Sequence, residues 1–187
     1  MLMLQDRDTQ LCENFPDRKS SHFFNSFFIE RLLVTDKKYN YNNIHRWSKK
    51  FDIFTKHKIF FPINLNNAHW TLAVVYMDEK RIHYYDSKCG AGMQQLEGLK
   101  KWIADEARSK KKMELDMTEW VLISEEAAVP QQTNGVDCGV FTIVCADFIS
   151  DVLRLSYSQK DMSTFREKIG TDIIRGKLTY DIKSVRK

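Results

Sequence analysis

Two neighbouring segments in the middle of the chain constrain its fold most, because together they predict a β-hairpin. Residues 69–76, HWTLAVVY, alternate in side-chain type, and residues 81–87, RIHYYDS, follow after the polar DEK. Alternation with a period of two, interrupted by a short polar turn, is typical of two antiparallel strands. One side of the first strand carries Trp70, Leu72, Val74 and Tyr76.

The flanking segments predict helices and further strands in mixed order. Apolar residues recur at helical spacing in 21–33 (with Ser20 or Ser21 as the cap), in 93–107 despite Gly98, and in 162–178. Residues 57–65 predict a buried strand with a bulge or an edge at Pro62, and 119–124 predict a short strand. The nearly all-apolar run from Cys138 to Ile149 predicts a central buried helix. We therefore expect an α+β fold.

Length and composition favour one globular domain over residues 1–187. A chain of 187 residues with 43% hydrophobic and 29% charged side chains can bury a substantial core. The net charge of +4 is too small to indicate nucleic-acid binding, and the basic run at 108–113 is interpreted as a solvated helix end. No apolar stretch approaches the roughly 20 residues that span a bilayer, and the N-terminus does not have the pattern of a signal peptide.

The four cysteines, at positions 12, 89, 138 and 145, lie far apart and form no CxxC pair. This spacing argues against a zinc site and against a secreted disulfide framework. It is typical of a protein from a reducing, intracellular compartment.

The hairpin also predicts a pair of groups that could activate a nucleophile. His69 begins the first strand and Asp86 ends the second, and both lie on one face whether the turn has two residues or four. With four, Thr71 is opposite Asp86 and His69 lies on the diagonal, roughly 7–8 Å away between backbone positions. The alternative is that His69 merely begins a strand and Asp86 merely begins a turn.

Cys138 is a candidate nucleophile because it lies where a helix begins. The positive end of a helix dipole favours a thiolate, and the neighbouring Gly139 leaves the backbone beside the sulfur accessible. The alternative is that Cys138 is a core residue, which fits Cys145 far better. Gln132, six residues earlier, has a side-chain amide that could stabilise an oxyanion together with the Cys138 N–H.

Together, the segments INLNNAHWTLAVV, IHYYDSKCG and PQQTNGVDCGVF resemble the ubiquitin-like-protein-specific proteases, the Ulp/SENP family of SUMO proteases. Their His, Asp, Gln and Cys occur in the family's order, with gaps of 17, 46 and 6 residues. The segments HFFNSFFIERL, HRWSKKFDIF and YSQKDMSTFREKI extend the resemblance over nearly the whole chain.

The resemblance implies a papain-like fold, with a central mixed sheet flanked by helices, and assigns roles to five residues. Cys138 would be the nucleophile, His69 the general base, and Asp86 the group that orients His69. Gln132 would help to form the oxyanion hole, and Trp70 would pack over the Gly-Gly tail of SUMO. No cofactor and no metal are implied.

Domains of this family usually begin with a Trp-Leu-Asn-Asp-like segment, whose Trp forms a second wall around the glycine tail of the substrate. This chain opens at MLMLQDRD, which is similar to the end of the helix after that segment. We therefore expect an N-terminally shortened catalytic domain with its catalytic residues intact.

The main hypothesis is a SUMO-specific cysteine protease that processes precursors, releases SUMO from lysine, or both. The alternatives are a protease for another modifier such as NEDD8, and an inactive domain that binds SUMO. The expected partner is SUMO or a SUMO-like protein and its conjugates, with no nucleic acid and no membrane. A monomer is expected, located in the nucleus in preference to the cytoplasm.

Overall fold

The computed structural model describes residues 1–34, 38–124 and 129–178, and its centre is a five-stranded mixed sheet in the order β1-β4-β5-β6-β7. The pairs β4–β5 and β5–β6 are antiparallel, whereas β1 and β7 add to the edges in parallel. The strands are β1 (His22–Phe23), β4 (Lys58–Leu65), β5 (His69–Tyr76), β6 (Arg81–Tyr85) and β7 (Val121–Ile123). A separate two-stranded sheet pairs β2 (Leu33–Val34) with β3 (Lys38–Tyr39).

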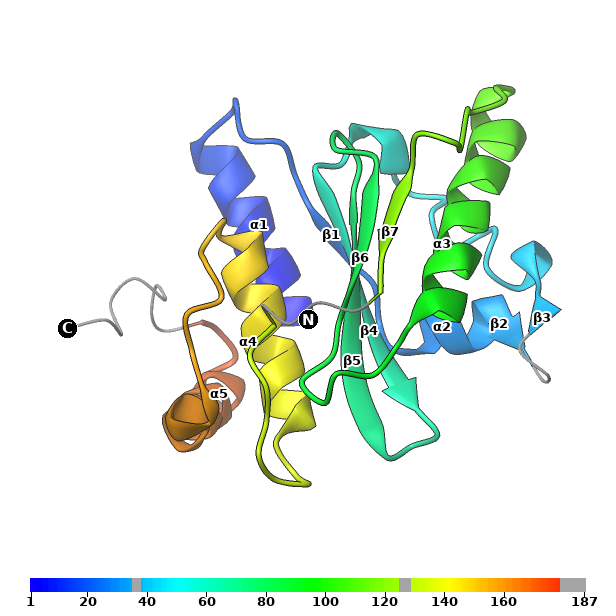
Figure 1. The fold of residues 1–187 in the computed structure, drawn as a ribbon. Coiled ribbons are helices and arrows are strands. Elements are labelled where there is room, and N and C mark those ends of the chain that lie inside the picture. The colour runs from blue at the N-terminus through cyan, green and yellow to red at the C-terminus, as the bar shows by residue number, and fades with distance from the viewer. Residues whose placement is uncertain (35–37, 125–128, 179–187) are drawn as a thin grey trace.

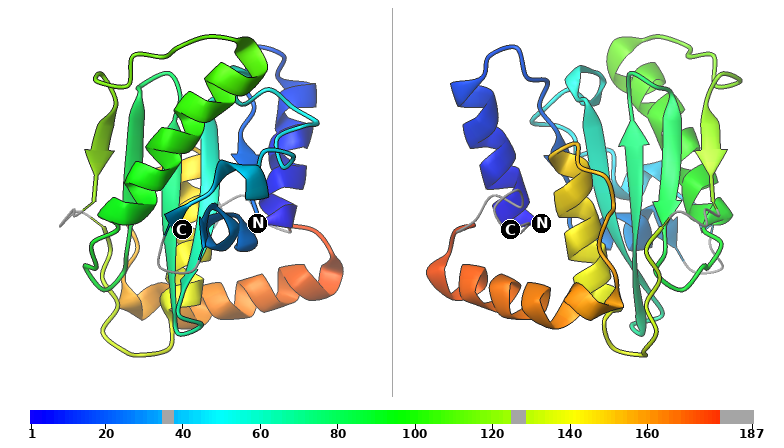
Figure 2. Two further views of the ribbon diagram at one scale, coloured as in Figure 1. Left: turned by 90° about the vertical axis from the view of Figure 1, so that its right-hand side faces the viewer. Right: turned by 60° about the vertical axis from the view of Figure 1, so that its left-hand side comes forward.

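Helices cover both faces of the five-stranded sheet (Figures 1 and 2). On one face lie α1 (Leu2–Asn14), α4 (Cys138–Ser150) and α5 (Met162–Arg175), and on the other lie α2 (Phe27–Leu32) and α3 (Met93–Glu106). This confirms the α+β class and the expected flanked mixed sheet. No helix within the described residues has the length and apolar character needed to cross a membrane.

The register of the β5–β6 hairpin confirms the four-residue turn. Tyr76 is opposite Arg81 and Leu72 is opposite Tyr85, so the next pair along sets Thr71 opposite Asp86 and leaves His69 on the diagonal. Both faces of β5 are buried, because helices cover both sides of the sheet: Val74 and Val75 are each completely inaccessible to solvent. The alternation in the sequence therefore distinguishes two cores rather than a core from a solvent face.

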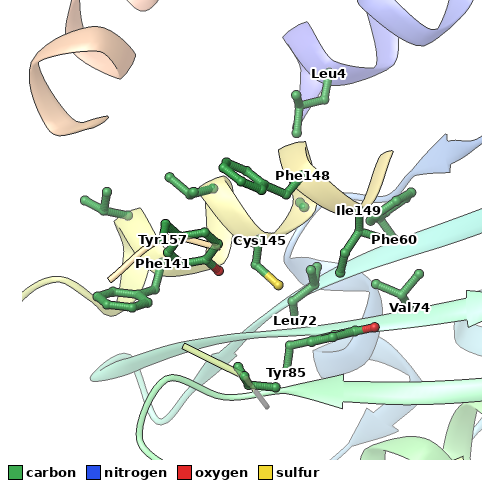
Figure 3. Close-up of a cluster of buried hydrophobic side chains, with 14 of the residues drawn as sticks. Leu4, Phe60, Leu72, Val74, Tyr85, Phe141, Cys145, Phe148, Ile149 and Tyr157 are labelled. Carbon is green, nitrogen blue, oxygen red and sulfur yellow. The ribbon is translucent and has the colours of Figure 1, made fainter. Parts of the chain in front are cut away.

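The core beneath α4 fixes that helix against the sheet (Figure 3). Its apolar side chains pack onto β4, β5 and β6, and the sulfur of Cys145 points toward Leu72 and Tyr85. Burial of one large apolar side chain, such as valine, leucine, isoleucine or phenylalanine, contributes about 1.5–3 kcal/mol to the stability of the fold. The α4 members of the cluster are Val140, Phe141, Val144, Cys145, Ala146, Phe148 and Ile149.

The predicted helix over 21–33 is wrong in its first half. Residues 22 and 23 form β1, paired in parallel with Ile59 and Phe60, and the helix α2 begins only at Phe27 with Ser26 as its N-cap. Neither Ser20 nor Ser21 is the cap, because the helix begins several residues after both, and the Ser21 backbone N–H donates instead to the buried carboxylate of Asp8 at 2.7 Å. Pairing with a distant strand thus overrides the local helical pattern.

Other expected elements are confirmed. The helices α3 and α5 and the strand β7 form where their patterns predict them, and Pro62 lies on β4 beyond the two residues that pair with β1, which makes it an edge position. The basic run is an exposed helix end, as predicted: Lys110 pairs with Glu106, Arg108 with Asp105 and Glu114, and Lys111 with Asp52.

Candidate active site

His69 and Asp86 form a hydrogen-bonded pair at one end of the sheet. The Nε2 atom of His69 lies 2.7 Å from Oδ1 of Asp86. The same carboxylate oxygen accepts the backbone N–H of Lys88 at 2.8 Å, so Asp86 is held from two directions. Asp86 is nearly inaccessible, with 4% of its side chain exposed, whereas 17% of the His69 side chain reaches solvent. The pair predicted from the hairpin is therefore present.

The second ring nitrogen of His69 is available for proton transfer. Nδ1 is buried and has no hydrogen-bond partner among the residues that the structure describes. Because Nε2 donates to Asp86, the neutral ring presents Nδ1 as its acceptor. A buried acceptor without a hydrogen-bond partner costs free energy, so such an atom in a folded protein calls for a functional explanation. An unbonded acceptor nitrogen on a ring held by a carboxylate is the arrangement that a general base needs.

Cys138 is the first residue of α4, and this helix start lies against the start of β5. A methyl group added at Gly139 would lie 3.5 Å from Cδ1 of Trp70, which is ordinary contact. Trp70 follows His69 in sequence and Gly139 follows Cys138, so the segments that carry Cys138 and His69 lie side by side. Cys138 is a free thiol with 6% of its surface exposed.

Asp137, directly before Cys138, is the centre of a polar network. Its carboxylate accepts hydrogen bonds from Asn134 and Gln159, both at 2.7 Å, and pairs with Arg166 of α5. Asn134, Arg166 and Gln159 together lower the pKa of Asp137 from its ordinary value. The network anchors the loop before Cys138 to α5 and keeps Asp137 ionised.

Gln132 is held by the residue that follows Asp86. Ser87 Oγ donates to Gln132 Oε1 at 2.6 Å, and the Gln132 backbone N–H donates to the Ser87 carbonyl at 2.8 Å. Gln132 Nε2 donates to the Asn134 carbonyl at 2.5 Å. The amide thus joins the Asp86 end of the site to the loop that carries Asp137 and Cys138. The sequence pattern assigned no role to Ser87, Asn134 or Arg166, because their contacts link segments far apart in the chain.

Trp70, the residue after His69, lines an open groove of about 550 Å³. Other parts of the lining come from α2, where Phe27 is 59% exposed, and from the start of α3. Amide side chains make up much of the lining, which suits contact with a polypeptide backbone. These amides are Asn64, Asn66, Asn67, Gln94 and Gln95.

The remaining cysteines lie outside this constellation. Cys145 is fully buried in the core beneath α4, and that burial raises its pKa to about 12. Cys12 is half-buried and Cys89 is exposed, and all four cysteines are free thiols. Within the described ranges, no three His, Cys, Asp or Glu side chains are grouped in a way that could hold a metal ion.

Comparison with known proteins places this site in a family context. Residues 1–177 match the Ulp1 protease family, C-terminal catalytic domain. The chain is 34% identical over 181 residues to ubiquitin-like-specific protease 1A of Arabidopsis thaliana, covering 94% of this chain and 35% of that protein. It is also 34% identical over 158 residues to human sentrin-specific protease 2, covering 84% and 26% respectively. The chain therefore spans about a third of these relatives or less.

A solved structure shares the fold. The C-terminal Ulp1 protease domain in complex with Smt3, the yeast ortholog of SUMO, superimposes with a TM-score of 0.73 at 28% identity. The match covers 92% of this chain and 75% of that one.

Proposed function

The chain belongs to the Ulp1 protease family, and we propose that it is a cysteine protease that cleaves after the C-terminal Gly-Gly of a SUMO-like modifier. The observation that carries the proposal is the 2.7 Å His69–Asp86 pair at the start of β5, against which the packing of Gly139 near Trp70 sets the helix start that carries Cys138. A nucleophile, a base and a group that orients the base are the parts that thiol catalysis needs.

In the proposed reaction, His69 Nδ1 takes the thiol proton of Cys138, and the sulfur attacks the carbonyl carbon of the terminal glycine. The oxyanion accepts hydrogen bonds from the Cys138 backbone N–H and the Gln132 amide. His69 then protonates the leaving amine, which leaves a thioester. Water, deprotonated by His69, attacks the thioester and releases the modifier and the thiol. Asp86 keeps Nε2 protonated and the ring oriented throughout.

The groove beside Trp70 supports a polypeptide substrate with an extended tail. A flat indole wall excludes bulky side chains and leaves room for glycine, while the amides that line the groove bond to a main chain. The partner we propose is SUMO or a SUMO-like protein, because the similar Ulp1 domain forms a complex with Smt3, the yeast ortholog of SUMO. Precursors and lysine conjugates both present the required Gly-Gly carbonyl.

The test is covalent labelling with a SUMO whose C-terminus carries an electrophile. The wild-type chain should form an adduct, and Cys138→Ala should form none, whereas Cys89→Ala should label as the wild type does because Cys89 lies outside the proposed mechanism. A parallel NEDD8 probe examines specificity. Absence of labelling by SUMO, or labelling that survives Cys138→Ala, would refute the proposal, and labelling by NEDD8 alone would reassign the modifier.

We further propose that the protein acts as a monomer without nucleic acid, in the nucleus. Four free cysteines and the small net charge support this assignment. Light scattering of the purified chain checks the monomer, and imaging of the tagged full-length protein in its source cells checks the compartment.

A further inference from the structure

Ser87 lies between two parts of the site that the proposed reaction uses separately. It follows Asp86, which orients His69, and both its main chain and its side chain bond to Gln132, 45 residues later. Only 5% of Ser87 is exposed, so water does not compete effectively for these bonds. The proposed mechanism gives Ser87 no chemical step.

The contacts of the Gln132 side chain fix which of its ends faces which way. The Asn134 carbonyl is an acceptor only, so the atom that it meets must be the NH₂ end of the amide. With the opposite orientation, Oε1 would face that carbonyl oxygen, and the two would repel. Ser87 Oγ holds the oxygen end at 2.6 Å. One N–H of the amide then bonds to Asn134, and the second N–H is left for a ligand.

We propose that Ser87 is a positioning residue that holds the Gln132 amide with an N–H directed at the oxyanion. The inference rests on the proposed function, because it assumes that Gln132 donates to the tetrahedral intermediate. Without the Ser87 bond, the Asn134 carbonyl alone would hold the amide, and its second N–H would point at the oxyanion for a smaller part of the time. Ser87 thereby couples the end of β6, where His69 is oriented, to the stabilisation of the oxyanion.

A double-mutant cycle of Ser87→Ala and Gln132→Ala tests this coupling. Gln132→Ala should lower kcat by about 100-fold or more, as for loss of an oxyanion donor. Ser87→Ala should lower kcat on the order of tenfold with KM unchanged, because the oxyanion exists only after attack. With Gln132 already alanine, Ser87→Ala should change kcat by less than about twofold. A further tenfold loss in that background, or an effect on KM alone, overturns the proposal.

Gln131→Ala is the matched control. Gln131 Nε2 bonds to the carbonyls of Asp86 and Val129, so it also joins these segments but does not touch the Gln132 amide. Gln131→Ala should lower kcat by the same factor whether or not Gln132 is alanine. If Gln131→Ala and Gln132→Ala were instead as strongly non-additive as Ser87→Ala and Gln132→Ala, any change that loosens this region would have the same effect, and the proposal would be overturned. Ser87→Cys retains the size of the side chain and a weaker donor. If Ser87→Ala does not fold, Ser87→Cys takes its place in the cycle. It should lower kcat by less than Ser87→Ala would, and this loss should again disappear when Gln132 is alanine.

A second measurement separates this inference from the proposed function. In the ¹⁵N-labelled chain, the Gln132 NH₂ signals are assigned by their loss in Gln132→Ala, and the N–H that bonds to the Asn134 carbonyl should exchange slowly with solvent. In Ser87→Ala this N–H should exchange at least tenfold faster, and unchanged exchange overturns the positioning role even if the enzyme is active. If the wild-type chain cleaves no modifier, the proposed function fails, while this exchange still decides whether Ser87 orients the amide.

Discussion

Alanine at position 90 should disable the His69–Asp86 pair without unfolding the protein. A methyl group on Gly90 would lie 2.3 Å from Oδ2 of Asp86, where ordinary contact begins near 3.4 Å, and Gly90 has no left-handed backbone angle that alanine would strain. Oδ2 must therefore retreat by about 1 Å. The two carboxylate oxygens move as one rigid group, so Oδ1 is displaced by a similar amount. Its 2.7 Å contact with His69 then lengthens beyond hydrogen-bonding range.

The expected cost follows from the bond that is lost. A hydrogen bond to a charged group contributes about 1.5–3 kcal/mol, which corresponds to a roughly 10- to 150-fold decrease in kcat/KM. Steady-state cleavage of a fusion protein joined through the modifier's Gly-Gly measures this decrease, and thermal unfolding monitors the fold. Gly135→Ala is the control, since a methyl group there meets no atom within 4 Å. It should stay within about twofold of the wild type.

Two results would show the reasoning to be wrong. One is a folded Gly90→Ala variant with kcat/KM within twofold of the wild type. The other is a full additional loss when Gly90→Ala is combined with Asp86→Ala, because a clash that acts only through the Asp86 carboxylate has no effect once that carboxylate is gone.

Three further changes test the surroundings of the site. Arg166→Met should destabilise the fold by about 1 kcal/mol or less, because Arg166 is half exposed. The pKa of Asp137 is lowered in the folded state, so the difference in unfolding free energy between Arg166→Met and the wild type should persist above the ordinary carboxyl range. It should disappear when urea unfolding is repeated below about pH 4. At pH 7.5, iodoacetamide should modify exposed Cys89 and spare Cys145, whose pKa is raised to about 12, as read by peptide mass spectrometry; modification of Cys145 without denaturant would contradict its burial. Gly170→Ala, in the open interior of α5, should stabilise by about 0.5–1 kcal/mol in thermal unfolding, and a lower Tm would contradict the open space found there.

The sequence was most informative where function depends on local geometry. Side-chain alternation in a strand fixes the face on which His69 and Asp86 lie, so their pairing could be predicted without knowing the rest of the fold. The buried helix after Cys138 was equally predictable, because a continuous apolar run can only be internal. Family resemblance then assigned Gln132 and Trp70, which no local pattern distinguishes from ordinary loop and strand residues.

The errors and omissions concern contacts between distant segments. Residues 22 and 23 have a helical pattern and still form a strand, because β4 offers parallel pairing partners more than 30 positions away. The bond from Ser87 to Gln132 crosses 45 residues, and the pair of Asp137 with Arg166 crosses 29. No periodicity encodes such contacts, since they depend on how the elements pack rather than on their own sequences.

These distant contacts also explain how the site can be rigid although part of it lies on a loop. Cys138 and His69 begin regular elements that are fixed by the core beneath α4 (Figure 3), whereas Gln132 lies in a segment that has no helix or strand up to Asp137. An apolar core cannot fix such a loop, because its side chains are polar and partly exposed. Polar contacts hold the loop instead. Ser87 joins it to the end of β6, the Asn134 carbonyl binds Gln132 within the loop, and Asp137 joins it to α5. Polar contacts therefore position Gln132, the proposed oxyanion donor, relative to the same sheet against which apolar packing positions Cys138, the proposed nucleophile.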